Sequence, residues 1–245
     1  MPIKLNDFMQ ETYYKVDYEK LLDYFSQFRI FLSKWNNKKY LKNWIDCLKR
    51  YDKEISQQIN EKITKINVNT NLVKDEWFNQ KIDLEGNEIV IHFNINIVNQ
   101  AIYNLKEQEI NLNLFKNEKS NIYWTPILNE TIIEKHTIKN SPIYLTKFFN
   151  NEQGRITKWL LIDGNHRVSK ALALGKQTIN CVYITQDEII KINPFINDFD
   201  KYFYILWNEI NNLKNYRINN LYISDRKLFK KSFLIHKLSW FNYFI

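Results

Sequence analysis

The sequence predicts an α+β protein in which mainly helical regions flank a small mixed sheet with helices. Before residue 66, apolar side chains repeat at intervals of three and four, which is the period of amphipathic helices. Between residues 83 and 184, short apolar runs end in turn residues, which is the pattern of strands. Only four Gly and four Pro occur in 245 residues, so breaks are few and helices are favoured.

The composition permits a sizeable core and restricts the class of partner. Hydrophobic residues make up 44% of the chain and charged residues 25%, which excludes a mostly disordered protein. The net charge of +8 fits a polyanionic partner such as nucleic acid or nucleotide. Lysines that merely cover the surface would give the same charge, and both interpretations stay open.

Cysteine usage and hydropathy bear on the compartment. Cys47 and Cys181 lie far apart without a CxxC pair, which predicts a reduced protein with no structural zinc and no metal cluster. Cys181 stands in an apolar run and is expected in the core. The N-terminus does not have the pattern of a signal peptide, and no apolar run reaches 18 residues. We expect a cytoplasmic protein with no membrane partner.

Residues 1–66 are expected to form a helical N-terminal region. Asp17 is a candidate N-cap for a helix over 17–34. A second helix is expected around 41–48 and a more polar third over 51–65, and core packing is the favoured use of their apolar stripes.

Residues 67–120 are expected to connect this region to the next. After a polar linker, a hairpin turns at 85–87 and returns through 89–93. His92 alternates with apolar residues there, which favours a half-buried histidine over a catalytic one. A helix over 95–106 and a Lys- and Asn-rich loop over 111–120 complete the region.

Residues 121–190 are expected to form the core of the sheet. Strands are predicted at 142–148, 158–162 and 178–184, with a turn at 150–154 between the first two. Residues 191–245 are expected to form a helical, basic extension with a helix over 202–213. In its last part, Arg and Lys are interspersed with aromatic residues. This pattern indicates either a surface that binds nucleic acid or a final amphipathic helix, and we favour the helix.

The stretch 160–175 combines a strand, a tight turn and a helix. Asp163-Gly164-Asn165 ends the apolar run, helical spacing follows, and Gly175 stands where a left-handed C-cap belongs. A helix N-terminus carries a partial positive charge and unpaired N–H groups. Together with His166 and Arg167, this helix N-terminus is suited to bind a phosphate group.

The order of these motifs resembles the ParB/sulfiredoxin superfamily. Pro142-Ile143-Tyr144-Leu145, the glycine turn, the Asp-Gly-x-His-Arg motif at 163–167, the helix ending in Leu174-Gly175 and the strand through Val182 follow the family core. The resemblance covers about residues 121–190. It implies a nucleotide pocket with phosphates held at this turn and helix.

Members of this superfamily differ in activity, and the motif separates them. The sulfiredoxin cysteine corresponds to Asn165, which cannot perform sulfur–phosphoryl chemistry, so reductase activity is excluded. Partition proteins usually carry Gly-Glu-Arg-Arg, whereas Gly164-Asn165-His166-Arg167 is closer to the serine-kinase form. The kinase motif has histidine at the position of Asn165, and no helix-turn-helix pattern follows the core.

The resemblance assigns roles at the turn. Arg167 would pair with a phosphate, or would form an ordinary surface ion pair. His166 would donate to a phosphoryl oxygen, or would cap the helix. Gly164 and Asn165 would supply backbone N–H groups, and Gly164 also permits close approach or a positive φ. Ser169 and Lys170 are further candidate phosphate contacts.

Three carboxylates are candidates for a catalytic role. Asp163 would hold Mg²⁺ or orient a substrate hydroxyl, or it would be the N-cap of the next helix. The family kinases place a glutamate before the first core strand, so Glu130 and Glu134 are candidates to position an acceptor. Each could equally be a surface acid. His136 is a weaker candidate.

Two functions follow as expectations. The first is an enzyme that binds ATP or another nucleoside triphosphate with Mg²⁺ and transfers or hydrolyses a phosphoryl group, with a small hydroxyl compound or a protein side chain as acceptor. The second is a ParB-like DNA-binding protein with a nucleotide-controlled switch, which contacts DNA through its basic C-terminal region. A degenerate member that binds a partner through its first 120 residues is a third.

Overall fold

The computed structural model describes residues 14, 16–65, 75–84, 86–116, 120–127, 141–152 and 155–234. It confirms the α+β class, with a two-stranded antiparallel sheet, a mixed five-stranded sheet and several helices. The described residues divide into two compact units. Unit 1 combines parts of 1–74, 79–92 and 195–245, and unit 2 combines 75–78 with parts of 93–194.

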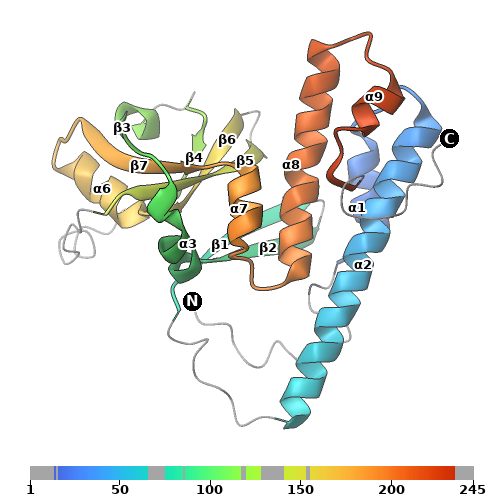
Figure 1. Ribbon diagram of the computed structural model, residues 1–245, viewed down its shortest axis with the longest axis horizontal. Coiled ribbons are helices and arrows are strands. Elements are labelled where there is room, and N and C mark those ends of the chain that lie inside the picture. Colours follow the sequence, from blue (N-terminus) through green and yellow to red (C-terminus); the bar gives the residue numbers. More distant parts are fainter. Residues whose placement is uncertain are drawn as a thin grey trace. The chain divides into compact units, whose positions relative to one another are not determined.

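Unit 1 is built mainly from helices at the two ends of the chain. The helices are α1 (Tyr18–Ser26), α2 (Lys34–Lys65), α8 (Asp198–Asn219) and α9 (Asp225–Phe229). The hairpin strands β1 (Trp77–Leu84) and β2 (Asn87–Asn94) contribute residues 79–92. Helices α2 and α8 lie side by side (Figure 1), and the stacked rings of Tyr51 and Tyr202 join them with centroids 4.5 Å apart.

Helix α1 begins as predicted and ends earlier than predicted. The carboxylate of Asp17 accepts the N–H groups of Glu19 and Lys20 at 3.2 and 3.1 Å, which confirms the N-cap. The chain leaves the helix after Ser26. The side-chain oxygen of Asn37 accepts the N–H groups of Ile30 and Phe31 at 3.1 and 3.3 Å, so a residue of the next helix holds this turn.

Helix α2 is continuous where two helices were predicted. No Gly or Pro occurs between residues 34 and 65, so nothing local ends the helix near residue 50. Helix α8 likewise exceeds the predicted 202–213. It starts after Asn197, whose side chain accepts the N–H of Asp200 at 2.9 Å.

Two buried carboxylates on α8 bind other segments of unit 1. Glu209 accepts hydrogen bonds from the Tyr40 hydroxyl at 2.6 Å and the Trp44 indole at 3.3 Å, both on α2, and from the Ser232 hydroxyl at 2.6 Å. Burial raises the pKa of Glu209, and these donors oppose the rise. The polar network therefore fixes the C-terminal segment and α2 to the same point of α8.

Asp200 is the second buried carboxylate on α8. It accepts the backbone N–H of His92 at 2.7 Å and lies 2.8 Å from the Nδ1 atom of the same residue. The Tyr14 hydroxyl also donates to it. Burial raises the pKa of Asp200, and the contacts with His92 and Tyr14 lower it. His92 is 8% exposed, so it is more buried than the sequence predicted and fixes β2 to α8.

An ion pair between Arg217 and Asp225 connects the end of α8 to the start of α2. Asp225 accepts the N–H groups of Leu32 and Ser33 at 2.8 and 3.0 Å and the side-chain amide of Asn36 at 3.0 Å. The Arg217 guanidinium also donates to the carbonyl of Ile30 at 3.2 Å. We call this group of contacts the Arg217–Asp225 clasp.

The basic and aromatic residues near the C-terminus separate by environment. Phe229 is buried against Phe31 and Tyr40, while Arg226, Lys227, Lys230 and Lys231 are exposed. This agrees with the favoured interpretation of an amphipathic helix, because the aromatic side chain packs in the core. The rest of the extension, 235–245, lies outside the described residues.

Unit 2 contains the three predicted strands and two further strands that the sequence did not predict. The sheet order is β3 (Glu107–Asn111), β7 (Thr178–Ile184), β5 (Ile143–Glu152), β6 (Arg155–Asp163) and β4 (Ile122–Tyr123). β5 runs antiparallel to β6 and parallel to β7. β3 lies between the helix predicted over 95–106 and the loop predicted over 111–120. It was not predicted because Ile110 is its single buried side chain, which gives only a weak strand pattern.

Helices complete unit 2. They are α3 (Ile95–Ala101) with a following 3₁₀ turn over Ile102–Asn104, the short α4 (Asn113–Lys116), α6 (Asn165–Ala173) and α7 (Gln186–Ile192). Thr185 caps α7 in a capping box with Glu188. Helix α6 lies against the sheet (Figure 1), with Val168 and Ala171 in its apolar core.

Two compensating irregularities shape the pairing of β5 with β6. The partner of Lys147 is Trp159, and the next pair is Asn150 with Thr157, so β5 holds an extra residue. Between Leu145 and Tyr144 the extra residue is on β6. The two shifts cancel, and Tyr144 stands opposite Asp163 as a simple count back from the hairpin turn would give.

Both cysteines are buried and unpaired, which confirms the expectation for Cys181. Burial raises the thiol pKa of Cys47 to about 11 and that of Cys181 to about 12. Among the described residues, no helix is both long and apolar enough to cross a bilayer.

The Arg217–Asp225 clasp should be an important part of the stability of unit 1. The replacement Asp225→Asn removes the charge that pairs with Arg217, whose side chain is 9% exposed, and should cost about 3 kcal/mol near neutral pH. Urea unfolding of the full chain measures this loss. The exposed Asp23→Asn on α1 is the matched control and should change stability by less than about 0.5 kcal/mol.

The loss of stability in Asp225→Asn should depend on pH, and the direction of this dependence follows from the pKa of Asp225. Burial raises the pKa of Asp225, but hydrogen bonds from Ser33, Asn36 and Leu32 and from Arg217 outweigh it, so the net pKa is lowered. A lowered pKa gives stability that is present above the usual aspartate range and is lost as pH falls through the folded-state value. The gap between wild type and Asp225→Asn should therefore narrow below about pH 4. A gap that widens on acidification would contradict this account.

Candidate functional site

The candidate site is the turn between β6 and α6. β6 ends at Asp163, Gly164 takes a left-handed conformation with φ of 109°, and α6 begins at Asn165. The positive φ agrees with the conformational role expected for Gly164. Gly164 is also the N-cap residue, and as a glycine it has no side chain with which to cap the helix. The alternative that Asp163 is the N-cap is therefore wrong.

Gly164 is required by packing as well as by conformation. A Cβ atom added at Gly164 would stand 2.4 Å from Cγ2 and 2.9 Å from Cβ of Ile143 on β5. Both distances are shorter than van der Waals contact. The turn therefore lies directly against the first residue of β5, which brings the N-terminus of α6 to the end of the sheet.

Asp163 and Arg167 form an ion pair across the first turn of α6. The Arg167 guanidinium donates to Oδ2 of Asp163 at 2.5 Å, and the two side chains are 15% and 17% exposed. Another guanidinium nitrogen donates to the carbonyl of Ser141 at 3.3 Å and to the Ser141 hydroxyl. Arg167 is thus held in one orientation by groups on both sides of the turn.

Tyr144 lies beside this ion pair. It is the partner of Asp163 in the sheet register and is 3% exposed. Burial raises the pKa of its phenol, the charge of Asp163 raises it further, and the charge of Arg167 lowers it. Ser141 and Tyr144 were not selected from the sequence as site residues. For Tyr144 the sequence did contain a signal. Counting residues back along both strands from the hairpin turn places Tyr144 opposite Asp163.

Asn165 and Ser169 bind the segment that precedes β5. The side-chain oxygen of Asn165 accepts the N–H of Thr125 at 3.1 Å, and the Ser169 hydroxyl accepts the N–H of Ile127 at 3.0 Å. Ser169 is 7% exposed. Residues 125–127 therefore run along the first two turns of α6.

Glu130, Glu134 and His136 lie outside the described residues. The chain that leads to them is fixed on α6 as far as Ile127, only three residues before Glu130. Their assignment as catalytic candidates stays a prediction. His166 and Lys170 are half-buried on α6, one helical turn apart.

One aspartate and several positively charged groups lie at the N-terminus of α6. Asp163 is offset by Arg167, Lys170 follows within the second turn, and the helix dipole adds partial positive charge at Asn165. No group of three or more His, Cys, Asp and Glu side chains that could hold a metal occurs in the described part of the chain. A Mg²⁺ ion bound through one carboxylate and phosphate oxygens would need no such group.

Comparison with known proteins adds no relative. No protein-family model, no curated protein and no solved structure matches this chain. The assignment of a function therefore depends on the residues and on their geometry.

The packing of Gly164 gives a testable result. Gly164→Ala should destabilise unit 2 by about 3 kcal/mol, because it combines an unfavourable positive φ with the overlap against Ile143. Thermal or urea unfolding of the full chain measures the loss. Gly86→Ala and Gly175→Ala are matched controls, since both glycines have positive φ and neither has an atom within 4 Å of the added Cβ.

Each control substitution should lower the free energy of unfolding by about 1 kcal/mol, because only the unfavourable positive φ contributes. Equal losses at all three glycines would show that the contact with Ile143 is not a close one.

Proposed function

We propose that unit 2 is a ParB/sulfiredoxin-like nucleotide-binding unit whose Asp163–Arg167 turn binds the phosphates of a nucleoside triphosphate with Mg²⁺. The resemblance of the motif and the order β5, β6, turn, α6, β7 support the proposal. The observation that carries it is the orientation of Arg167. Asp163 and Ser141 hold its guanidinium at the N-terminus of a helix whose N-cap residue is a glycine.

The phosphate chain would lie against the first turn of α6. The backbone N–H groups from Gly164 to Arg167 and the helix dipole attract an anion there. A guanidinium carries five N–H donors, so Arg167 can bind a phosphate while it keeps a contact to Ser141. His166 and Lys170, on the same helix, are the further donors proposed to reach phosphoryl oxygens.

Asp163 would change its partner when nucleotide binds. Without a cation its carboxylate would repel a triphosphate, and its charge is offset by Arg167. Asp163 would hold Mg²⁺, whose charge would offset the repulsion, and the Arg167 guanidinium would then be able to pair with phosphate. The donor set fits this mode, because Mg²⁺ usually takes one or two carboxylates together with substrate phosphates.

The proposed chemistry is phosphoryl transfer or hydrolysis. The protein would contribute positioning and charge, and bound Mg²⁺ would offset charge on the transferring group. Glu130 or Glu134 would orient the hydroxyl or water that accepts the phosphoryl group. Because Asn165 and Ser169 fix the preceding backbone to α6, the chain enters this segment from beside the proposed phosphate site.

Calorimetric titration of the full chain with ATP, CTP, GTP and ADP, each with and without Mg²⁺, tests the proposal. We expect one triphosphate to bind in the presence of Mg²⁺. Arg167→Lys keeps the positive charge but removes the planar fork, and should weaken binding by roughly tenfold or more. Asp163→Asn should abolish the enhancement by Mg²⁺.

The control for these variants is Lys176→Ala, which removes one exposed charge at the opposite end of α6. It should leave the affinity within about twofold. Absence of binding to all four nucleotides, or equal effects of Arg167→Lys and Lys176→Ala, would reject the proposal. Loss of turnover with intact binding in Glu130→Gln or Glu134→Gln would identify the carboxylate that positions the acceptor.

A further inference from the structure

The positive charge of the chain is concentrated at one end of unit 1. No acidic residue occurs between Asp23 and Asp46, and Asp225 is the single acid among residues 210–234. These two stretches hold eleven basic residues, a charge of +10, which exceeds the +8 of the whole chain. We call them together the basic end.

Most of these basic side chains face solvent. Arg217 is neutralised by Asp225 within the clasp, and Lys39 and Lys214 are half-buried over the rings of Trp35 and Phe28. The others are exposed: Arg29, Lys34, Lys38, Lys42, Arg226, Lys227, Lys230 and Lys231. The net charge of the basic end is therefore available to an anionic partner.

Exposed apolar side chains gather in the same place. Leu32 is 72% exposed, Leu221 70% and Tyr222 fully, and Trp35 and Ile218 are more than half exposed. Where the structure describes side chains of unit 1, these five are all of its exposed large hydrophobic residues. Several exposed apolar side chains in one region of a protein surface often mark an interaction site.

The Arg217–Asp225 clasp joins the two stretches into one surface. Leu32 donates its N–H to Asp225, and Trp35 precedes Asn36, another donor to Asp225. Ile218 follows Arg217, and Tyr222 precedes Ile223, whose carbonyl accepts from Arg217. The end of α8, the loop to α9 and the start of α2 accordingly lie at the same end of unit 1 (Figure 1).

We propose that the basic end rests on an anionic lipid bilayer, with its apolar side chains inserted between headgroups and its Lys and Arg side chains among the phosphates. Trp, Tyr and Leu flanked by Lys and Arg form the pattern of an interfacial membrane contact. Each basic residue near an anionic surface contributes attraction, and the basic end has almost no acidic residue to oppose it.

Two other partner classes fit less well. The core of a protein–protein interface is depleted in Lys, whereas six of the eight exposed basic residues of the basic end are lysines. A nucleic acid would use the charge and the two aromatic rings, but it gains little from the exposed aliphatic side chains of Leu32, Ile218 and Leu221.

A surface contact of this kind needs no membrane-spanning helix. The sequence predicted no membrane partner because no apolar run is long enough to cross a bilayer. A protein that lies on the bilayer requires a local apolar patch and positive charge instead, and neither forms a long apolar run in the sequence.

Flotation of the full chain with vesicles tests the proposal. Binding should be at least roughly tenfold stronger to vesicles with about one third phosphatidylglycerol than to pure phosphatidylcholine at low salt. Leu221→Ser/Tyr222→Ser should weaken binding about tenfold, and the loss should persist at high salt because apolar insertion is not screened. Both side chains are exposed, so folding should be unaffected.

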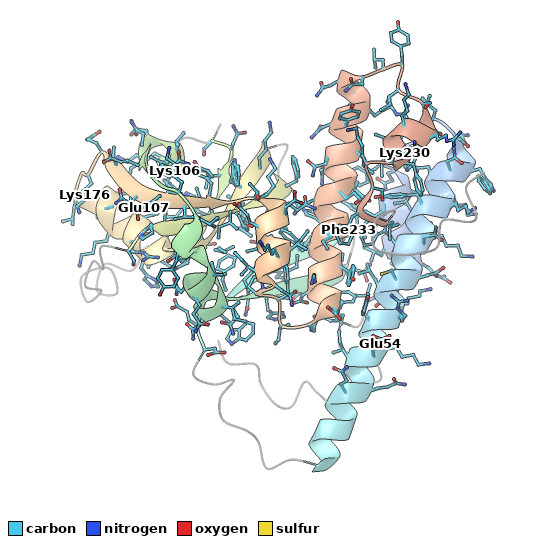
Figure 2. All side chains as sticks on the ribbon, viewed as in Figure 1. Glu54, Lys106, Glu107, Lys176, Lys230 and Phe233 are labelled. Atoms are coloured by element: carbon cyan, nitrogen blue, oxygen red, sulfur yellow. The ribbon has the colours of Figure 1, made fainter. Side chains whose placement is uncertain are left out.

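The charge variant is Lys227→Gln/Lys230→Gln, which should weaken binding roughly tenfold at low salt and little at high salt. Its matched control is Lys106→Gln/Lys176→Gln, which removes the same charge from unit 2 and should leave binding unchanged. Figure 2 labels Lys230 at the basic end and the two control lysines in unit 2.

Three outcomes would overturn the proposal. The first is no binding to anionic vesicles at roughly 50 mM salt. The second is equal loss in the charge variant and its control, which would indicate general charge attraction. The third is tighter binding to duplex DNA than to vesicles with no effect of Leu221→Ser/Tyr222→Ser, which would assign the surface to nucleic acid.

Discussion

The close contact between Gly164 and Ile143 determines the geometry of unit 2 around the candidate site. Without a side chain at Gly164, the chain can turn from β6 into α6 directly against the start of β5. This turn places Val168 and Ala171 over the sheet, in the core that also contains Ile143 and Cys181. The same turn directs the N-terminus of α6 toward the end of the sheet where Asp163 and Arg167 meet.

The Asp163–Arg167 ion pair links the fold to the proposed function. It is mostly removed from solvent, and Ser141 supports it from the chain before β5. A guanidinium held in this way has lost most of its rotational freedom before any ligand arrives, so less entropy is lost on binding a phosphate. The pair would also explain how an aspartate can stand at the proposed phosphate site, because its charge already has a partner.

Unit 1 depends on two buried carboxylates and one half-buried carboxylate that join distant parts of the chain. Asp200 binds β2, Glu209 binds α2 and the C-terminal segment, and Asp225 binds the start of α2. Each carboxylate would be costly to bury alone, and each accepts several hydrogen bonds. The Arg217–Asp225 clasp has a second consequence, since it brings two basic stretches from opposite ends of the chain into one surface.

The sequence by itself determined the α+β class, the strands β5, β6 and β7, the helix after the Asp-Gly-Asn-His-Arg motif and the glycine at its turn. These features depend on local period and turn chemistry, which are readable along the chain. Only the tertiary structure decided where α1 ends, because Asn37 holds that turn from the next helix. β3 likewise depends on pairing with β7, since a single buried residue gives no strand pattern.

In the candidate site, the sequence indicated the residues of the motif but not the residues that contact them. The i, i+4 spacing of Asp163 and Arg167 permitted an ion pair, but Ser141, Thr125 and Ile127 reach the site through pairing and docking of other segments. The basic end has the same origin. Its two stretches lie about 190 residues apart in sequence, and hydrogen bonds from Leu32 and Ser33 to Asp225, formed only on folding, make them neighbours.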